Sequence, residues 1–382
     1  MDWREARDLF PITRQKIYLH HAGVSPFSDR VRAAVEEIAA QGNLQGADYE
    51  AYQQDVLETR GALARLLGGR PEEIAFTRST SHGLSILAFG LDWQAGDNVV
   101  GARWEYPANL FPWMALGDRG VELRLVEPEG GRITPEAIFA LCDARTRLVA
   151  LSWVQFWNGF RADIATIAAE CRRQGILFAV DVIQGLGALR LEVEEAGCDF
   201  AAAGSGKWLM AIPGVGVAWC RAELIERLRP VTAGTHSMED GTAYFDPRLE
   251  WKRSAERFEE SVPASSLNLA ALRAAAGLLL EVGPEVIEER VLGLSRRLGE
   301  GLADLGYNVI APWPREPGES SGIVSFNRPG VPCQELLRDL TAAGVVCRTH
   351  RDFVRLAPHF YNTEAEIDRV LEILSPRQAM AG

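Results

Sequence analysis

Cysteine is scarce and scattered in this chain of 382 residues, which contains six. No two of them form a C-x-x-C pair or the compact disulfide framework of a small secreted domain, so we expect reduced, mostly buried thiols. The six histidines show no H-x-x-x-H spacing or other ligand pattern. The sequence therefore predicts no structural or catalytic metal site.

Long apolar runs and basic runs are also missing. No apolar stretch approaches the roughly 18 residues of a membrane-spanning helix, and the charged start MDWREARDLF does not resemble a secretory signal. No basic run offsets the net charge of −12, which argues against nucleic-acid or anionic-membrane partners. With 47% hydrophobic and 24% charged residues, the composition is typical of a globular protein, and we expect a cytoplasmic one.

Short runs rich in valine, isoleucine and leucine alternate with longer segments of helical period. This alternation predicts an α/β fold in which helices sandwich a mainly parallel sheet. The crossover helix is clearest at residues 163–175, where Asp163 can cap the start and Gly175 can end it. Seven runs are expected to be strands: residues 73–77, 97–102, 121–126, 146–154, 176–182, 199–204 and 214–220.

The sequence changes in character after about residue 260. Two long helical segments, roughly 264–281 and 284–305, precede short strands that alternate with helices. We therefore predict a large domain over residues 1–260 and a smaller α+β C-terminal domain over residues 261–382. The expected strands of the smaller domain are 323–326, 345–348 and 353–356, and its later helices are 333–343 and 363–374.

Lys207 follows a glycine-serine-glycine turn in the stretch AAAGSGKWLM. A nucleotide phosphate loop needs G-x-x-x-x-G-K-[ST], but Ala201 replaces its first glycine and Trp208 replaces its final hydroxyl residue. A nucleotide site is therefore disfavoured. Two alternatives stay open for this residue, a solvated loop lysine and a lysine that reacts covalently.

Polar residues follow two other strands, at the edge of the sheet where ligands of open α/β folds bind. Ser79, Thr80 and Ser81 begin a probable helix, whose free N–H groups favour a phosphate, although a plain helix cap has the same pattern. Asp181 ends an apolar strand, where an acid is costly unless it has a partner. Gln184 lies three residues further on and could point the same way.

Aromatic residues and an arginine complete this set. Tyr106, Phe111 and Trp113 follow another strand; such residues are usually core, but one of them could stack on a flat ligand. Arg355 lies in an apolar strand, where it suits either a carboxylate ligand or a structural ion pair. Together these groups are what pyridoxal phosphate and an amino-acid substrate require.

The chain resembles the class V aminotransferase and cysteine-desulfurase-like group of fold-type I pyridoxal-phosphate enzymes. The resemblance rests on YLHHAGVSP, STSHG, EYPANLFPW, VDVIQG, GSGKWLM and RLAPHFYNTEAEID, which follow in this order over nearly the whole chain. It implies a large domain with a seven-stranded sheet that binds the cofactor, and a small C-terminal domain. It also implies a small-molecule substrate, either an amino acid or a small amine, and a homodimer with active sites at the subunit interface.

The resemblance also assigns roles by position. It implies that Lys207 is the catalytic residue and holds the cofactor as an imine, and that Asp181 partners the pyridine nitrogen. Gln184 would donate a hydrogen bond to the ring hydroxyl, and Tyr106 would stack on the ring. Arg355 matches the arginine that binds the substrate carboxylate.

The expected phosphate ligands depart from the family pattern. Thr80 and Ser81 match two of them, but Gly204 and Gly206 stand where many members have a serine and a histidine. We expect Ser205 to replace one of the lost contacts.

Cysteine desulfurases carry their nucleophilic cysteine on a loop between two arginines of the small domain, and this chain departs from that pattern. Only THRDFV separates Arg348 from Arg355, and the preceding Cys347 is expected to be a buried, inert thiol. This pattern favours amino transfer over persulfide chemistry, with C–S lyase or epimerase as alternatives on the same scaffold. A non-catalytic scaffold is the alternative from another class. Five further residues could line a substrate pocket or merely pack: His20, His21, His236, Trp157 and Asn158.

Overall fold

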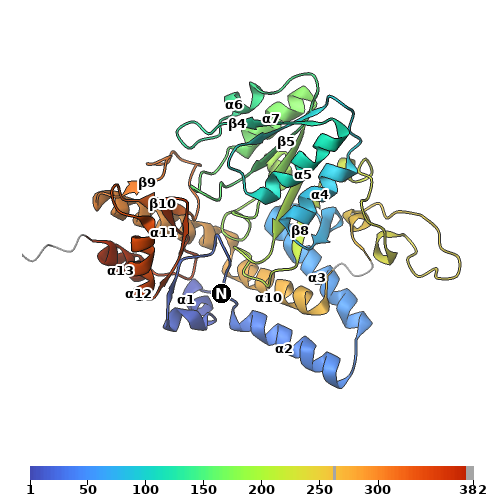
Figure 1. Cartoon of the computed structure of the whole chain (residues 1–382). Coiled ribbons are helices and arrows are strands. Elements are labelled where there is room, and N and C mark those ends of the chain that lie inside the picture. The colour runs from blue at the N-terminus through green and yellow to red at the C-terminus, as the bar shows by residue number, and fades with distance from the viewer. Residues whose placement is uncertain (261–263, 376–382) are drawn as a thin grey trace, which may run out of the picture.

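The computed structural model describes residues 1–260 and 264–375 of the chain. All seven strands predicted for the large sheet are present, in the order β2-β8-β7-β6-β5-β3-β4 (Figure 1). β8 runs antiparallel to β2 and β7, whereas the other neighbouring pairs are parallel, so the prediction of a mainly parallel sheet is confirmed. The strand bounds are β2 Ile74–Thr77, β3 Asn98–Ala102, β4 Glu122–Val126, β5 Thr146–Ser152, β6 Leu177–Asp181, β7 Phe200–Gly204 and β8 Gly216–Cys220.

Alternate residues of each strand enter different hydrophobic cores. In β6, Phe178 joins a core that includes α3 (Tyr49–Leu67) and α7 (Ile164–Gln174). The next residue, Ala179, joins a second core that includes α4 (Thr80–Gly90). Because successive side chains of a strand point to opposite faces, this division shows that helices cover both faces of the sheet.

Helix ends follow the signals in the sequence. α7 begins after Asp163, whose carboxylate accepts a hydrogen bond from the Thr166 N–H at 3.1 Å. It ends at Gly175, which has the left-handed conformation that glycine adopts readily, with φ of 70°. The other helices are α1 Trp3–Asp8, α2 Asp29–Leu44, α5 Phe111–Met114, α6 Pro135–Phe139, α8 Val193–Ala196, α9 Ala222–Ile225, α10 Ser266–Val282, α11 Pro284–Asp304, α12 Cys333–Ala342 and α13 Glu364–Leu374.

The C-terminal part of the chain forms a smaller antiparallel sheet in the order β12-β13-β10-β9. In β13, Val354 and Leu356 enter a core with α11, α12 and α13, so Arg355 between them faces away from these helices. The bounds are β9 Asn308–Val309, β10 Val324–Asn327, β12 Arg348–His350 and β13 Phe353–Leu356.

The single strand expected over 345–348 is wrong in its extent. Its first half is β11 (Val345–Val346), which pairs in parallel with β1 (Ile17–Tyr18) near the N-terminus. Its end belongs to β12, which pairs with β13 instead. The strand divides because two different partners compete for its backbone groups. Elsewhere, α10 packs against α2 and α3 (Figure 1). Within residues 1–260 and 264–375, no helix has the length and apolar character to cross a membrane.

A buried ion pair connects α3 to the segment that follows the large sheet. Arg60 donates two hydrogen bonds to Glu259, at 2.9 and 3.1 Å, and both side chains are buried. Glu259 also accepts a hydrogen bond at 2.7 Å from the backbone N–H of Phe76 in β2. Its carboxylate therefore holds a strand and a helix together.

Replacing this carboxylate should destabilise the protein strongly. In Glu259→Gln the buried guanidinium loses its counter-charge, so we expect unfolding to be easier by roughly 3–5 kcal/mol. Denaturant unfolding followed by circular dichroism measures the change. Asp368→Asn is the control, because the Arg297–Asp368 pair is solvent-exposed and its loss should change the midpoint little. Equal shifts in the two variants would contradict the assignment.

Candidate active site

Strands β2, β3, β6 and β7 direct their carboxyl ends to the same edge of the large sheet. The chain carries Thr80 just after β2, Tyr106 after β3 and Lys207 after β7, while Asp181 is the last residue of β6. All four line one cavity of about 330 Å³, together with Ser81 and Ser205. Parallel order is therefore what brings together residues that lie far apart in the sequence.

Lys207 lies in the cavity with its Nζ 5.1 Å from the centre of the Tyr106 ring. Its backbone carbonyl accepts hydrogen bonds from the Ser25 hydroxyl at 2.5 Å and the Met210 N–H at 2.9 Å, which hold the turn. Burial lowers the pKa of Lys207 to about 8; the nearby Asp181 opposes this shift and Arg355 adds to it. A substantial fraction of the amine is therefore neutral near pH 7 to 8.

Asp181 is buried and lines the same cavity. One carboxylate oxygen accepts a hydrogen bond from the Ile183 N–H at 2.9 Å, but Oδ2 has no hydrogen-bond partner among the described residues. Burial raises the pKa of Asp181 to about 7, and the nearby Glu105 adds to this shift. A buried acceptor without a donor is costly. A protonated ring nitrogen is a donor that fits this oxygen.

Glu105 is a functional candidate that the sequence did not reveal. It is fully buried, and its carboxylate accepts hydrogen bonds from the Ser152 N–H at 2.7 Å, the Ser152 hydroxyl and the Gln155 side chain at 2.9 Å. Ser152 is the register partner of Asp181 in the sheet. Glu105 therefore anchors the loop that carries Tyr106 to the strand beside Asp181. The only signal was an acid next to the predicted stacking residue.

The N-terminus of α4 forms the other end of the cavity. The Thr80 hydroxyl accepts a hydrogen bond from the Gly204 N–H at 2.9 Å, which leaves its own proton to donate. Ser81 is exposed. Arg78 also lines the cavity, where it pairs with Glu260, and sequence reasoning had missed it. A helix N-terminus with free hydroxyls and a nearby arginine suits a phosphate.

The Ser205 side chain is used differently from what was expected. Its hydroxyl lies 2.7 Å from the carbonyl oxygens of Ile212 and Val215, to which it donates, so it stabilises the lysine loop instead of pointing at a ligand. At Gly206 a Cβ would lie 2.8 Å from Pro213, so a side chain such as histidine would require the loop to shift.

Gln184, unlike Ser205, does not line the cavity. Its amide nitrogen donates to the Ala22 carbonyl at 3.0 Å, and its amide oxygen accepts from the Trp208 indole at 2.9 Å. The structure thus gives Gln184 the task of joining the lysine loop to the N-terminal segment.

Other candidates from the sequence have structural partners. His21 is buried between the Ala357 carbonyl and the Tyr361 hydroxyl, at 2.7 Å from each. Asn158 donates to the carbonyls of Gly131 and Ala311. Trp157 packs against the Trp104 ring, and its indole N–H, like His20 Nδ1, is unpaired within the described part of the chain.

His236 belongs to a polar cluster with Glu256 and Glu259, whose ligand atoms lie within 4.8 Å of one another. Hydrogen bonds to the two carboxylates raise the pKa of this histidine. Lys252 lies 2.7 Å from Glu256, and Arg60 pairs with Glu259, so the carboxylates already have cationic partners. The cluster is therefore an ion-pair network with no surplus of negative charge for a metal.

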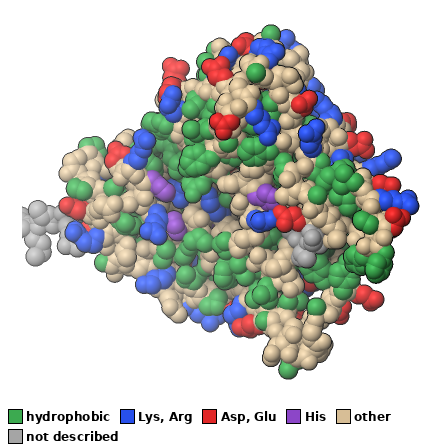
Figure 2. Space-filling model, turned by 45° about the vertical axis from the view of Figure 1, so that its right-hand side comes forward, with side chains coloured by type: hydrophobic (Ala, Val, Ile, Leu, Met, Phe, Trp, Pro, Cys, Tyr) green, Lys and Arg blue, Asp and Glu red, His purple; other side chains and the backbone are tan. Residues whose placement is uncertain are grey.

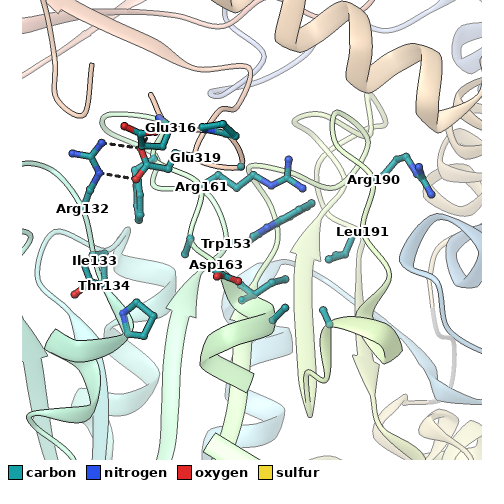
Figure 3. Close-up of a pocket in the computed structure, with 18 of the residues that line it drawn as sticks. Arg132, Ile133, Thr134, Trp153, Arg161, Asp163, Arg190, Leu191, Glu316 and Glu319 are labelled. Atoms are coloured by element: carbon teal, nitrogen blue, oxygen red, sulfur yellow. Dashed lines mark hydrogen bonds and ion pairs between the residues drawn. The ribbon is translucent and has the colours of Figure 1, made fainter. Parts of the chain in front are cut away.

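A larger pocket, of about 780 Å³, does not include Lys207 among its lining residues (Figure 3). Its arginines all have acidic partners: Arg132 donates two hydrogen bonds to Glu319, at 2.6 and 2.9 Å, Arg161 lies 3.1 Å from Glu288, and Arg190 lies 3.5 Å from Glu285. The smaller cavity is the better candidate for chemistry, because it contains groups with shifted pKa values and an unpartnered carboxylate oxygen.

Known proteins resemble this chain over nearly its full length. The YcbU protein of Bacillus subtilis, named an uncharacterized aminotransferase, is 27% identical and the match covers 97% of each chain. A probable cysteine desulfurase of Methanothermobacter thermautotrophicus is 27% identical, with 98% of each chain covered. The solved complex of the cystine C–S lyase C-DES has the same fold, with a TM-score of 0.88 at 24% identity over 96% of this chain and 99% of that one. The family model described as aminotransferase class-V matches residues 17–370, so the chain belongs to the class V aminotransferase family.

Proposed function

We propose that this protein is a pyridoxal-phosphate-dependent aminotransferase that acts on an amino acid or a small amine. One observation carries the proposal: a partly neutral Lys207 and the unpartnered oxygen of Asp181 share a cavity that ends at a helix N-terminus. Family membership supports it.

The residues of the cavity fit the cofactor. Asp181 would pair with the ring nitrogen, Tyr106 would cover the ring, and Thr80, Ser81 and the N–H groups of α4 would hold the phosphate. When bound, pyridoxal phosphate supplies an electron sink for negative charge that develops at the substrate Cα. An ionised Asp181 would keep the ring nitrogen protonated, and the protonated ring accepts that charge more readily.

Lys207 would be the catalytic base and acid. Its amine must be neutral to take a proton from the substrate Cα, and a pKa of about 8 makes this possible near neutral pH. Arg355 would orient the substrate through its carboxylate, since a planar guanidinium binds a carboxylate with two parallel hydrogen bonds. Tyr106 would exclude water from that side of the amine.

Amino transfer is preferred to persulfide chemistry for a structural reason. β12 and β13 are joined by a tight hairpin, so no long loop can carry a cysteine between Arg348 and Arg355. The preceding Cys347 is buried, and burial raises its pKa to about 12, which keeps the thiol protonated and unreactive. The C–S lyase and epimerase alternatives stay open, and assays for keto acid, ammonia and sulfide distinguish them.

We also propose a cytoplasmic homodimer with its active sites at the subunit interface. Support comes from the segment 239–250, which extends from the body of the molecule in Figure 1 and exposes Tyr244, Phe245 and Leu249. Exposed clusters of large apolar side chains commonly mark association surfaces. The division into a large domain over 1–260 and a small domain over 261–382 is likewise a proposal, with β1 and α10 as elements that cross it.

Covalent attachment of the cofactor tests the proposed function. The chain has three lysines, Lys16, Lys207 and Lys252, so the attachment site is easily mapped. We expect added pyridoxal phosphate to give a new absorbance band, and borohydride to fix one cofactor on Lys207, as peptide mass spectrometry would show. Lys207→Ala should lose both signals, whereas Lys252→Ala should keep them. A protein that takes up no cofactor would favour a scaffold.

The pH dependence of lysine acetylation tests the environment of Lys207. Because only the neutral amine reacts, labelling of the cofactor-free protein should rise with pH to a midpoint near 8. Asp181→Asn should lower that midpoint, since the carboxylate stabilises the charged lysine, and Arg355→Gln should raise it. Competitive labelling with acetic anhydride measures it, with the exposed Lys16 as internal reference for the reagent. A higher midpoint in Asp181→Asn would contradict the assignment.

A further inference from the structure

Three basic side chains share one face of the small sheet, and a fourth, that of His20, lies beside it. Arg348 and Arg355 are direct register partners in β12 and β13, so their side chains lie on the same face. His350 follows Arg348 by two positions in the same strand and points the same way. His20 forms a parallel bridge with Ala357, two positions after Arg355. Figure 2 shows histidine next to Lys and Arg side chains on this side of the molecule.

This basic face is directed at Lys207. Arg355 donates a hydrogen bond at 2.7 Å to the Phe156 carbonyl, and the Phe156 ring lies 5.4 Å from Tyr106 and 6.0 Å from His350. The His20 ring lies against Gly23, which lines the Lys207 cavity: a Cβ added there would be 2.2 Å from the ring. The four basic residues therefore adjoin the place where a substrate meets Lys207.

The basic face carries positive charge that no acid of the described chain offsets. Among residues 1–260 and 264–375, neither Arg348 nor Arg355 forms a salt bridge with a carboxylate, and the hydrogen bond of Arg355 goes to a backbone carbonyl. Like charges directly opposite one another on a sheet are destabilising. Three buried nitrogens also lack hydrogen-bond partners there: Arg355 Nε, His20 Nδ1 and His350 Nε2. Such groups are costly unless a ligand completes them.

On this face the arginines supply the positive charge, and the histidines supply neutral hydrogen-bond donors. Burial and the neighbouring arginines lower the pKa values of His20 and His350 to about 4, so both rings are neutral at pH 7. The arginines then supply the charge, while each imidazole offers one N–H. A substrate with a single carboxylate, its α-carboxylate, would bind Arg355 alone. Arg348 and the two histidines would then have no ligand group to bind.

We propose that the substrate is an amino dicarboxylic acid, with its α-carboxylate on Arg355 and its side-chain carboxylate on Arg348 and His350. His20 contributes a further N–H between the two groups. This inference rests on the proposed function and adds the substrate class to it. It also makes Arg348 and His350 specificity-determining residues.

Matched acid and amide substrates test the subsite on the cofactor-loaded enzyme. Aspartate should exceed asparagine, or glutamate exceed glutamine, by about tenfold or more in kcat/KM, because a charge-assisted hydrogen bond is lost in the amide. Arg348→Gln should remove this preference by raising KM for the acid, with kcat and the cofactor absorbance little changed. Arg338→Gln, an exposed arginine of the same domain, should keep it. His350→Gln should retain more of the preference than His350→Ala, because it keeps an N–H donor.

Binding without turnover separates this inference from the proposed function. By calorimetry, succinate or glutarate should bind about tenfold more tightly than its monoamide, and Arg348→Gln should abolish the difference. Equal affinities, together with equal kcat/KM for acid and amide, would overturn the dicarboxylate subsite even if borohydride fixes the cofactor on Lys207. Failure of cofactor attachment would overturn the proposed function, while calorimetry would still decide the subsite.

Discussion

The structure depends on keeping a half-buried amine and a buried carboxylate at the same edge of one sheet. Asp181 ends β6, and Lys207 follows β7, the neighbouring strand, so hydrogen bonding between the strands sets their separation. Desolvation brings their pKa values to about 8 for Lys207 and about 7 for Asp181, and the attraction between the two groups opposes both shifts. Each group therefore has a pKa close to neutral pH, where it can exchange a proton.

Most of the fold could be predicted because its signals are local. Strands such as β6 are short apolar runs, and α7 carries its own cap residues at both ends. Convergence of Thr80, Asp181 and Lys207 was also predictable, since every parallel strand ends at the same edge. The split of residues 345–348 was not, because β11 pairs with a strand at the other end of the chain.

The roles of individual polar side chains were harder to predict for a related reason. Gln184 and Ser205 lie in motifs that match the family, yet the structure commits their side chains to protein partners. Those partners are an indole and backbone carbonyls, and neither leaves a pattern in the sequence. Glu105 was missed because the donors that satisfy it come from β5 and the loop after it. Motif position therefore indicates a neighbourhood more reliably than it indicates a contact.

Compensation of charge, more than the size of a cavity, distinguishes the functional side of this molecule. In the larger pocket each lining arginine has a glutamate partner, as Arg132 has Glu319. Around Lys207 the opposite holds: within the described residues, Asp181 Oδ2 lacks a donor, and Arg355 donates to a backbone carbonyl without a carboxylate partner. A protein tolerates such uncompensated groups at a cost in stability. They are therefore best explained by ligands that complete them, a cation beside Asp181 and anions along the small sheet.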